Sequence, residues 1–222
     1  MIPPEQNAAF VAAMEDVLEV CRQPHDPRHP VVAMDEQPVQ LVKETRWPIP
    51  ARPGQPRRID YEYERAGTAA AFVFTAPLAH WRRWSVRPRR TATDWAEALR
   101  VLIEDDSPDA ERVVLICDNL NTHTIGAFYE TFPPAAARSL VERLEIHHAP
   151  KHGSWLNVAE CELSMLTRQC LHGRTGSIAA LEEKVRSWED DRNHRQCGVQ
   201  WHFTTADARV SLRRLHPQVQ LS

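Results

Sequence analysis

A continuous apolar run near the middle of the chain is the feature that most constrains the fold. Residues 112–117 read Arg-Val-Val-Leu-Ile-Cys, and the run ends abruptly at Asp118 and Asn119. Unbroken apolar runs of this length are typical of strands that lie inside a sheet and are covered on both faces. We therefore predict a buried strand that presents Asp118 at its carboxyl end.

A second apolar run, residues 31–34, ends in the same way. It reads Val-Val-Ala-Met and is followed by Asp35 and Glu36, which predicts another buried strand ending in a carboxylate. If the two strands are neighbours, their ends lie about 5 Å apart and Asp35 and Asp118 can share one metal site. Each aspartate on its own is equally compatible with an ordinary residue at a strand end or turn.

The remaining periodicities alternate between strand and helix. Residues 43–65 are rich in Pro and Arg and predict a long loop or extended arm between two strands. A helix over 94–105 is expected to be capped by Thr93 or Asp94. The other expected strands are 69–75, 82–86 and 144–148, and the other expected helices are about 5–21, 125–131, 134–144, 157–171, 177–193 and 205–212. This order predicts an α/β fold, a mixed sheet with helices on both faces.

Charge is distributed unevenly along the chain. The net charge is −3, but residues 43–93 hold eleven Lys or Arg against four Asp or Glu, a local balance of +7 that leaves −10 for the rest. A basic stretch on an acidic body suits contact with a phosphate backbone, and a solvated arginine-rich loop is the alternative. No apolar run is long enough to cross a bilayer and no signal-peptide pattern is present, so a cytoplasmic location without membrane partners is expected. Five cysteines without a Cys-x-x-Cys pair argue against a disulfide framework or a zinc finger.

A third carboxylate could come from the helix expected after residue 157. Glu160 and Glu162 are two positions apart, about 200° around a helix axis, so they cannot both face one site. Spacing alone leaves both open, and Glu160 could instead form a capping box with Asn157. Three oxygen ligands would favour Mg²⁺ or Mn²⁺. Two such ions roughly 4 Å apart can activate water or a 3′-hydroxyl and stabilise the leaving oxygen of a phosphodiester.

Three segments together resemble a known family. Residues 31–36 (Val-Val-Ala-Met-Asp-Glu), 117–123 (Cys-Asp-Asn-Leu-Asn-Thr-His) and 151–160 (Lys-His-Gly-Ser-Trp-Leu-Asn-Val-Ala-Glu) are similar to the three catalytic blocks of DDE transposases. The similarity is to the insertion-sequence-630 branch of the Tc/mariner superfamily, and it extends from the first helix to about residue 188. The resemblance implies a ribonuclease H-like fold in which Asp35, Asp118 and Glu160 hold two Mg²⁺ or Mn²⁺ ions.

The resemblance also implies a reaction and partners. Cut-and-paste transposition requires metal-dependent phosphodiester hydrolysis and strand transfer, acting on transposon ends and target DNA, and a homodimer on DNA is expected. The arm falls where related transposases contact DNA or the partner subunit. Asn119, His123 and Asn157 are expected to support the site, although Asn119 and His123 could equally be a turn asparagine and a surface histidine. The expected DNA-binding residues are Arg46, Arg52, Arg57, Arg58, Lys151 and His152.

The expected organisation is a linker helix over 1–28, a catalytic domain over 29–195 and a tail over 196–222. Members of this family begin with helix-turn-helix modules, and residue 1 corresponds to the linker after them. We therefore expect such modules to be missing or to be supplied by a separate upstream subunit. The alternatives are a catalytically silent remnant that binds DNA or an intact partner, and another nuclease of the same fold, such as a ribonuclease H or a Holliday-junction enzyme.

Overall fold

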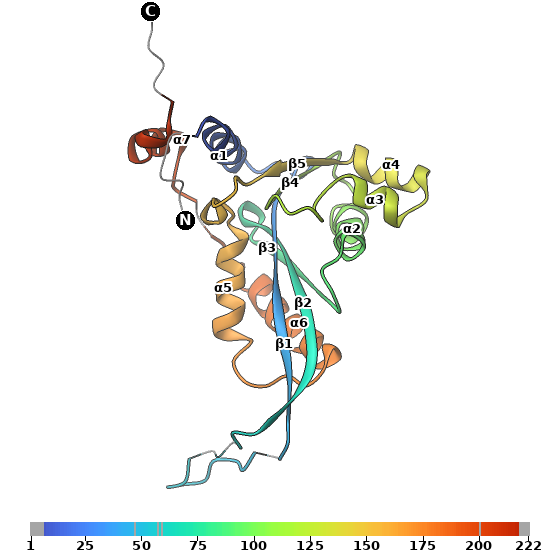
Figure 1. Cartoon of the computed structure of the whole chain (residues 1–222), viewed down its shortest axis with the longest axis vertical. Coiled ribbons are helices and arrows are strands. Elements are labelled where there is room, and N and C mark those ends of the chain that lie inside the picture. Colours follow the sequence, from blue (N-terminus) through green and yellow to red (C-terminus); the bar gives the residue numbers. More distant parts are fainter. Residues whose placement is uncertain (1–6, 47, 57, 59, 200, 218–222) are drawn as a thin grey trace, which may run out of the picture.

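One mixed five-stranded sheet forms the centre of the molecule (Figure 1). The computed structural model describes residues 7–46, 48–56, 58, 60–199 and 201–217. The sheet order is β3-β2-β1-β4-β5, with β1 antiparallel to β2 and parallel to β4. The strands are β1 (Val31–Glu44), β2 (Tyr63–Ala76), β3 (Trp81–Arg87), β4 (Val113–Cys117) and β5 (Leu144–His148). The predicted mixed sheet is confirmed.

Helices cover both faces of the sheet, as predicted (Figure 1). One face packs on α2 (Ala92–Val101), α3 (Gly126–Thr131) and α4 (Pro134–Glu142). The other face packs on α1 (Ala8–Cys21), α5 (Ala159–Gln169), α6 (Ile178–His194) and α7 (Thr205–Ser211). No helix within the described ranges is both long and apolar enough to cross a membrane.

Side-chain alternation along the strands divides the core into two layers. In β4, Val114 and Ile116 join the layer that contains α5, whereas Leu115 and Cys117 join the layer that contains α2. All five β4 residues are buried, because the strand has a neighbour on each side and helices on both faces. The strand predicted from the apolar run is confirmed.

The hairpin of β1 and β2 is longer than predicted. β1 does not end at Met34 but continues to Glu44, because β2 pairs with it from Ala33 opposite Thr75 to Glu44 opposite Tyr63, with one register shift between Gln40 and Val42. The prediction that Asp35 ends its strand is therefore wrong. The irregular arm predicted over 43–65 is therefore also shorter, because residues 43–44 belong to β1 and residues 63–65 belong to β2, and the two strands pair there. We call residues 45–62 the arm; the residues of the arm that the structure describes extend away from the rest of the fold (Figure 1).

Two helix starts also differ from the prediction. α2 is capped by Thr91 rather than by Thr93 or Asp94, and Asp94 completes a capping box with it; the helix then continues as a π-helical turn over Leu102–Asp106. α5 begins at Ala159, two residues after Asn157. The Asn157 side chain bonds a strand instead of forming a capping box with Glu160. A local sequence pattern could not reveal that distant partner.

Candidate active site

Asp35 and Asp118 lie on neighbouring strands at the same level of the sheet. The parallel pairing of β1 with β4 ends at Ala33 opposite Ile116, and each aspartate follows two residues later. The prediction that the two acid-bearing strands are neighbours is therefore confirmed. Asp35 is held within β1 by pairing with Val73 of β2, and Asp118 directly follows the last residue of β4.

Glu160 approaches the two aspartates from α5. A cavity of about 380 Å³ is lined by Asp35, Asp118 and Glu160, so the three predicted acids face one space. They do not form a tight cage around it. Within the described ranges, the one set of three ligand groups with atoms all within 4.8 Å of one another is Glu36, Asp118 and His123.

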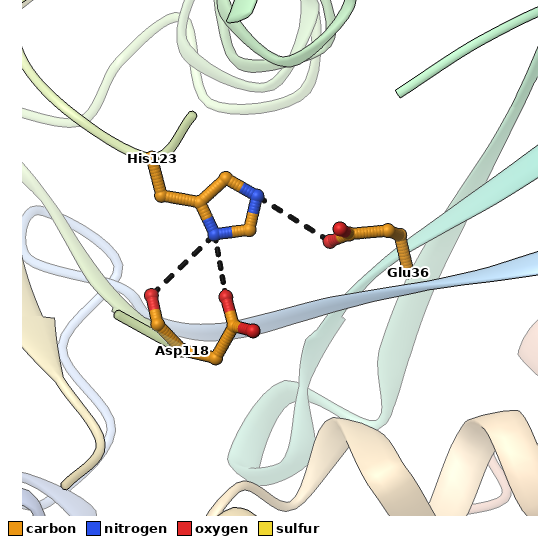
Figure 2. Close-up of side chains that lie close together, drawn as sticks. All are labelled: Glu36, Asp118 and His123. Atoms are coloured by element: carbon orange, nitrogen blue, oxygen red, sulfur yellow. Dashed lines mark hydrogen bonds and ion pairs between the residues drawn. The ribbon is translucent and has the colours of Figure 1, made fainter. Parts of the chain in front are cut away.

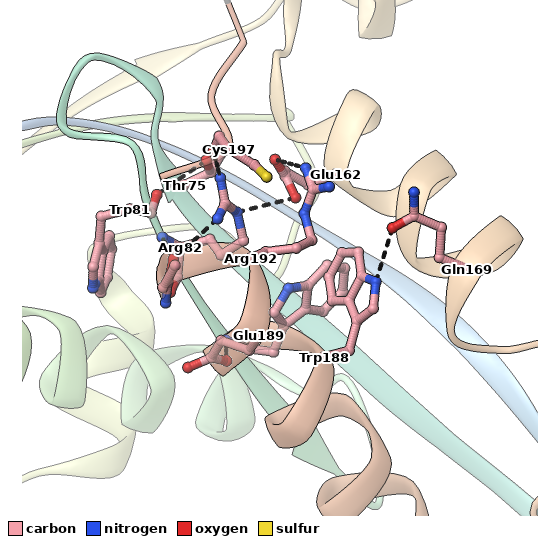
Figure 3. Close-up of polar contacts among 11 residues, drawn as sticks. Thr75, Trp81, Arg82, Glu162, Gln169, Trp188, Glu189, Arg192 and Cys197 are labelled. Carbon is pink, nitrogen blue, oxygen red and sulfur yellow. Dashed lines mark hydrogen bonds and ion pairs between the residues drawn. The ribbon is translucent and has the colours of Figure 1, made fainter. Parts of the chain in front are cut away.

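Glu162 does not line this cavity and instead lies beside Arg82 and Arg192 (Figure 3). Its carboxylate lies 3.2 Å from Nε of Arg82 on β3 and 3.1 Å from a guanidinium nitrogen of Arg192 on α6. The side chains of Glu162 and Arg82 are each 1% exposed. Of the two glutamates that sequence spacing left open, Glu160 is the one that lines the cavity, because Glu162 is bound in the protein interior.

Asn157 joins the start of α5 to β1. Its side-chain nitrogen donates to the backbone oxygen of Met34 at 2.8 Å and lies 3.4 Å from Oδ2 of Asp35. Its side-chain oxygen accepts from the backbone N–H of Ala159 at 3.1 Å. The residue is 2% exposed, and a buried, fully bonded amide of this kind fixes the distance between its partners. Asn157 therefore couples the positions of Asp35 and Glu160.

The environment of Asp35 disfavours its charged form. Burial raises the pKa of Asp35 to about 7, against a backbone hydrogen bond from Glu36 that lowers it; the charges of Glu160, Asp118 and Glu36 raise it further. Near neutral pH this carboxyl group therefore exchanges readily between its protonated and charged forms. A cation in the cavity would favour the charged form.

Glu36, His123 and Asp118 form a second polar group beside the cavity (Figure 2). Nδ1 of His123 lies 2.6 Å from Oδ1 of Asp118, and its Nε2 lies 3.4 Å from Oε2 of Glu36. The ring is 1% exposed and stacks on Trp95 at 5.3 Å between centroids. Burial alone would lower the pKa of His123, but hydrogen bonds to Asp118, Cys117 and Glu36 raise it to about 11.

Each ring nitrogen of His123 therefore faces a carboxylate, and two neighbouring negative charges favour the charged imidazolium form. The alternative reading of His123 as a surface residue is wrong. Glu36 was not predicted as a site residue, because its role depends on a histidine 87 positions away in the sequence. The one feature of the sequence that could have indicated Glu36 is its position directly after Asp35.

The predicted DNA-binding residues fall in two places. Lys151 and His152 line the cavity beside Asp118, together with Asn119, which was predicted to support the site. His152 adopts a left-handed backbone conformation, φ 69°, which non-glycine residues adopt mainly in tight turns. These three residues therefore surround the mouth of the cavity that the acids line.

The other predicted contacts lie on the arm, away from the cavity. Arg46 is exposed and lies 3.5 Å from Asp60. Arg52 and Arg58 are exposed and take part in the two bridges that fold the arm back on itself. Arg57 lies outside the described residues. The structure thus brings together the acids and the residues around the cavity, but not the arm arginines.

Comparison with solved structures places this fold beside that of a transposase. The chain is similar to the structure described as the Mos1 mariner paired end complex with Mn, at a TM-score of 0.54 and 18% identity over 88% of this chain and 60% of that one. The same values hold for the Mos1 transposase paired-end complex with left transposon end. The chain thus spans about 60% of the length of these relatives, and the similarity confirms the ribonuclease H-like fold.

Sequence comparison gives the family. The sequence matches none of the curated proteins. It matches the family described as DDE superfamily endonuclease over residues 30–182, which is more than half of the chain and contains Asp35, Asp118 and Glu160. The chain therefore belongs to the DDE superfamily endonuclease family.

Proposed function

We propose that this chain is the catalytic domain of a cut-and-paste DNA transposase of the insertion-sequence-630 branch of the Tc/mariner superfamily. The observation that carries the proposal is the arrival of Asp35, Asp118 and Glu160 at one cavity from β1, β4 and α5. Family membership and the similarity to Mos1 complexes with paired ends support it. The proposal includes DNA ends and target DNA as substrates, a homodimer on DNA, and a helix-turn-helix subunit as a further partner.

The three acids suit a pair of Mg²⁺ or Mn²⁺ ions. The donor set consists of carboxylate oxygens, which these cations prefer. The charges of Glu160 and Asp118 contribute to the raised pKa of Asp35, and bound cations would relieve that repulsion. When bound, such ions polarise the phosphodiester and lower the pKa of the attacking water. A Mos1 relative was crystallised with Mn.

The protein groups around the acids orient them and bind substrate in this proposal. Contact with His123 engages Oδ1 of Asp118, which leaves its second oxygen for a cation. Asn157 fixes Asp35 relative to α5. Asn119, Lys151 and His152, at the mouth of the cavity, contact the phosphates next to the cleaved bond. Arg46, Arg52, Arg57 and Arg58 contact DNA farther away.

Two measurements test the proposed function. Calorimetric titration with Mn²⁺ should show binding to the wild-type chain and none to Asp118→Ala. Cleavage should be compared on duplex DNA and on an RNA–DNA hybrid in the presence of Mg²⁺ or Mn²⁺. Metal binding with DNA cleavage supports the proposal. Absence of metal binding indicates a silent remnant, and cleavage confined to the RNA strand of the hybrid indicates a ribonuclease H.

Stabilisation by Mg²⁺ is expected to depend on pH through Asp35. Its folded-state pKa of about 7 lies above the ordinary value of 3.8, so the metal-free fold binds this proton more tightly than the unfolded chain does. That contribution to stability is present below the ordinary pKa and is lost as pH rises through 7. Bound Mg²⁺ requires the charged form, so its stabilising effect should be small at about pH 5 and larger at about pH 8.

Thermal unfolding with and without Mg²⁺ at the two pH values measures this effect. The Asp35→Asn variant is the control. The asparagine amide does not titrate between pH 5 and pH 8, and it binds Mg²⁺ more weakly than a carboxylate does, so the pH dependence should disappear. Equal stabilisation of the wild-type chain at both pH values would contradict the assignment of Asp35 as a ligand.

Replacing His123 is expected to weaken metal binding without removing a ligand. Groups that orient metal ligands typically contribute about 10- to 100-fold to affinity, and His123→Ala frees the Asp118 carboxylate to rotate. Calorimetric titration with Mn²⁺ should therefore show a loss of this size, measured below the unfolding temperature of the variant. His123→Asn, which keeps one donor, should lose less. Unchanged Mn²⁺ affinity in both variants would show that His123 is only structural.

A further inference from the structure

A second hollow adjoins the cavity of the three acids. It has a volume of about 400 Å³, lies between β1 and α5, and shares Asp35 and Glu160 with the first cavity. The two acids therefore stand where the two hollows meet. Besides these two acids, the hydrogen-bonding side chains that line this second hollow are Glu36, Gln37, Ser164, Thr167 and Arg168; Glu36 lies beside His123, which faces its carboxylate.

The lining residues from α5 form one row along the helix. Ser164, Thr167 and Arg168 follow Glu160 by four, seven and eight positions, the spacing of residues on one helix face. The opposite face of α5 contributes buried residues such as Ala159 and Leu166 to the core. The helix therefore presents a polar row that starts at the acids and leads away from them.

This row has unused capacity to bind an anion. The Gln37 side-chain oxygen accepts from the Thr167 hydroxyl at 3.3 Å, and the Gln37 side-chain nitrogen has no protein partner among the described residues. Over the same ranges, no carboxylate forms an ion pair with Arg168. By contrast, Arg100 on α2 and Arg138 on α4 each pair with a glutamate four residues later. A guanidinium group and an amide donor suit phosphate oxygens.

The row also has a direction. α5 runs alongside β1, and β1 continues to the arm (Figure 1). A strand of nucleic acid with its cleaved bond at Asp35 and Glu160 must continue on both sides of that bond. Asn119, Lys151 and His152 lie on one side, in the first cavity, and the second hollow lies on the other.

We propose that the second hollow binds the sugar–phosphate backbone of the DNA strand next to the cleaved bond, on the side that leads toward the arm, with Arg168 as its cationic contact. This inference rests on the proposed function. The contacts are to phosphate, so they position the strand without reading its sequence. The strand then follows one continuous course from Lys151, across the acids and along α5.

DNA affinity of Arg168 variants tests the inference. Binding of two labelled duplexes of unrelated sequence, each with a single-stranded overhang, is measured by fluorescence anisotropy in Mg²⁺ buffer over a series of salt concentrations. Arg168→Ala should lower affinity by about fivefold to tenfold near 0.1 M salt on both duplexes, and reduce the slope of log affinity against log salt by about one. Arg168→Lys should restore the slope because it restores the charge.

Arg138→Ala is the matched control. Arg138 is an exposed arginine on α4, on the other side of the fold from α5 (Figure 1), and its loss changes the net charge equally. If Arg168→Ala and Arg138→Ala bind alike while the wild-type chain binds and cleaves DNA, the inference is wrong and the proposed function stands. If the wild-type chain neither binds nor cleaves either duplex, the proposed function fails and the inference fails with it.

Discussion

A Glu160→Gln variant is expected to cleave DNA about a thousandfold more slowly than the wild-type chain, the upper range for removing one group that stabilises a transition state. Glutamine has nearly the same shape as glutamate but carries no charge, so it is a poor ligand for Mg²⁺. Glu160 is exposed and lines the cavity with Asp35 and Asp118. Its replacement should therefore leave the unfolding temperature nearly unchanged, or raise it slightly because carboxylate repulsion falls.

Cleavage of plasmid DNA with Mg²⁺ and thermal unfolding measure the two effects. The informative control is Glu162→Gln on the same helix, assayed below its own unfolding temperature. Glu162 has no contact with the cavity, so a folded Glu162→Gln variant should keep most of its cleavage. If Glu160→Gln cleaves at the wild-type rate, Glu160 is not a ligand and the acid triad is wrong.

Glu162→Gln is expected to lower the free energy of unfolding by about 3–5 kcal/mol, the usual cost of removing one partner of a buried ion pair. The substitution leaves Arg82 and Arg192 without their shared carboxylate, and Arg82 is 1% exposed. Arg82 also donates to the side chain of Asn193 and to the backbone oxygen of Cys197. These bonds cannot neutralise its charge. For a chain of this size the unfolding temperature should fall by roughly 6–20 °C.

Urea unfolding of the wild-type and variant chains measures the loss. The exposed pair of Arg138 and Glu142 on α4 provides the comparison, since exposed pairs contribute at most about 1 kcal/mol. Glu142→Gln should therefore unfold close to the wild-type midpoint. A Glu162→Gln variant as stable as Glu142→Gln would mean that water reaches the two arginines and that the pair is not buried in solution.

The strands that could be predicted were those whose own residues carry the signal. Val113–Cys117 is apolar throughout, and its burial by helices on both faces follows from that composition. The length of β1 could not be predicted, because the polar residues 35–37 and Pro38 interrupt any strand periodicity, and the strand continues through pairing with β2. Likewise, the helix cap was predicted at Thr93 or Asp94, and Thr91 could be identified as the cap only from the backbone geometry.

In the candidate site, too, the features with a local sequence signal could be predicted and those that depend on distant partners could not. The three acids and their order along the sheet came from short apolar runs and from resemblance. The partners of those acids did not, because Glu36 with His123 and Glu162 with Arg82 join segments far apart in sequence. Buried ion pairs of this kind leave no local pattern. Charge and spacing alone left Glu160 and Glu162 equivalent; the resemblance favoured Glu160, and the structure shows Glu162 bound to Arg82 and Arg192.

Because β1 is one continuous strand, it sets the distance between the acids and the arm. One strand carries both Asp35 and, nine residues later, Glu44 at the base of the arm, a separation of roughly 30 Å at the usual rise per residue. One turn of B-form DNA spans about 34 Å. If the arm of a transposase with this fold binds a DNA duplex, the carboxylates would therefore contact that duplex about one helical turn away. Both contacts would lie on the same side of the double helix.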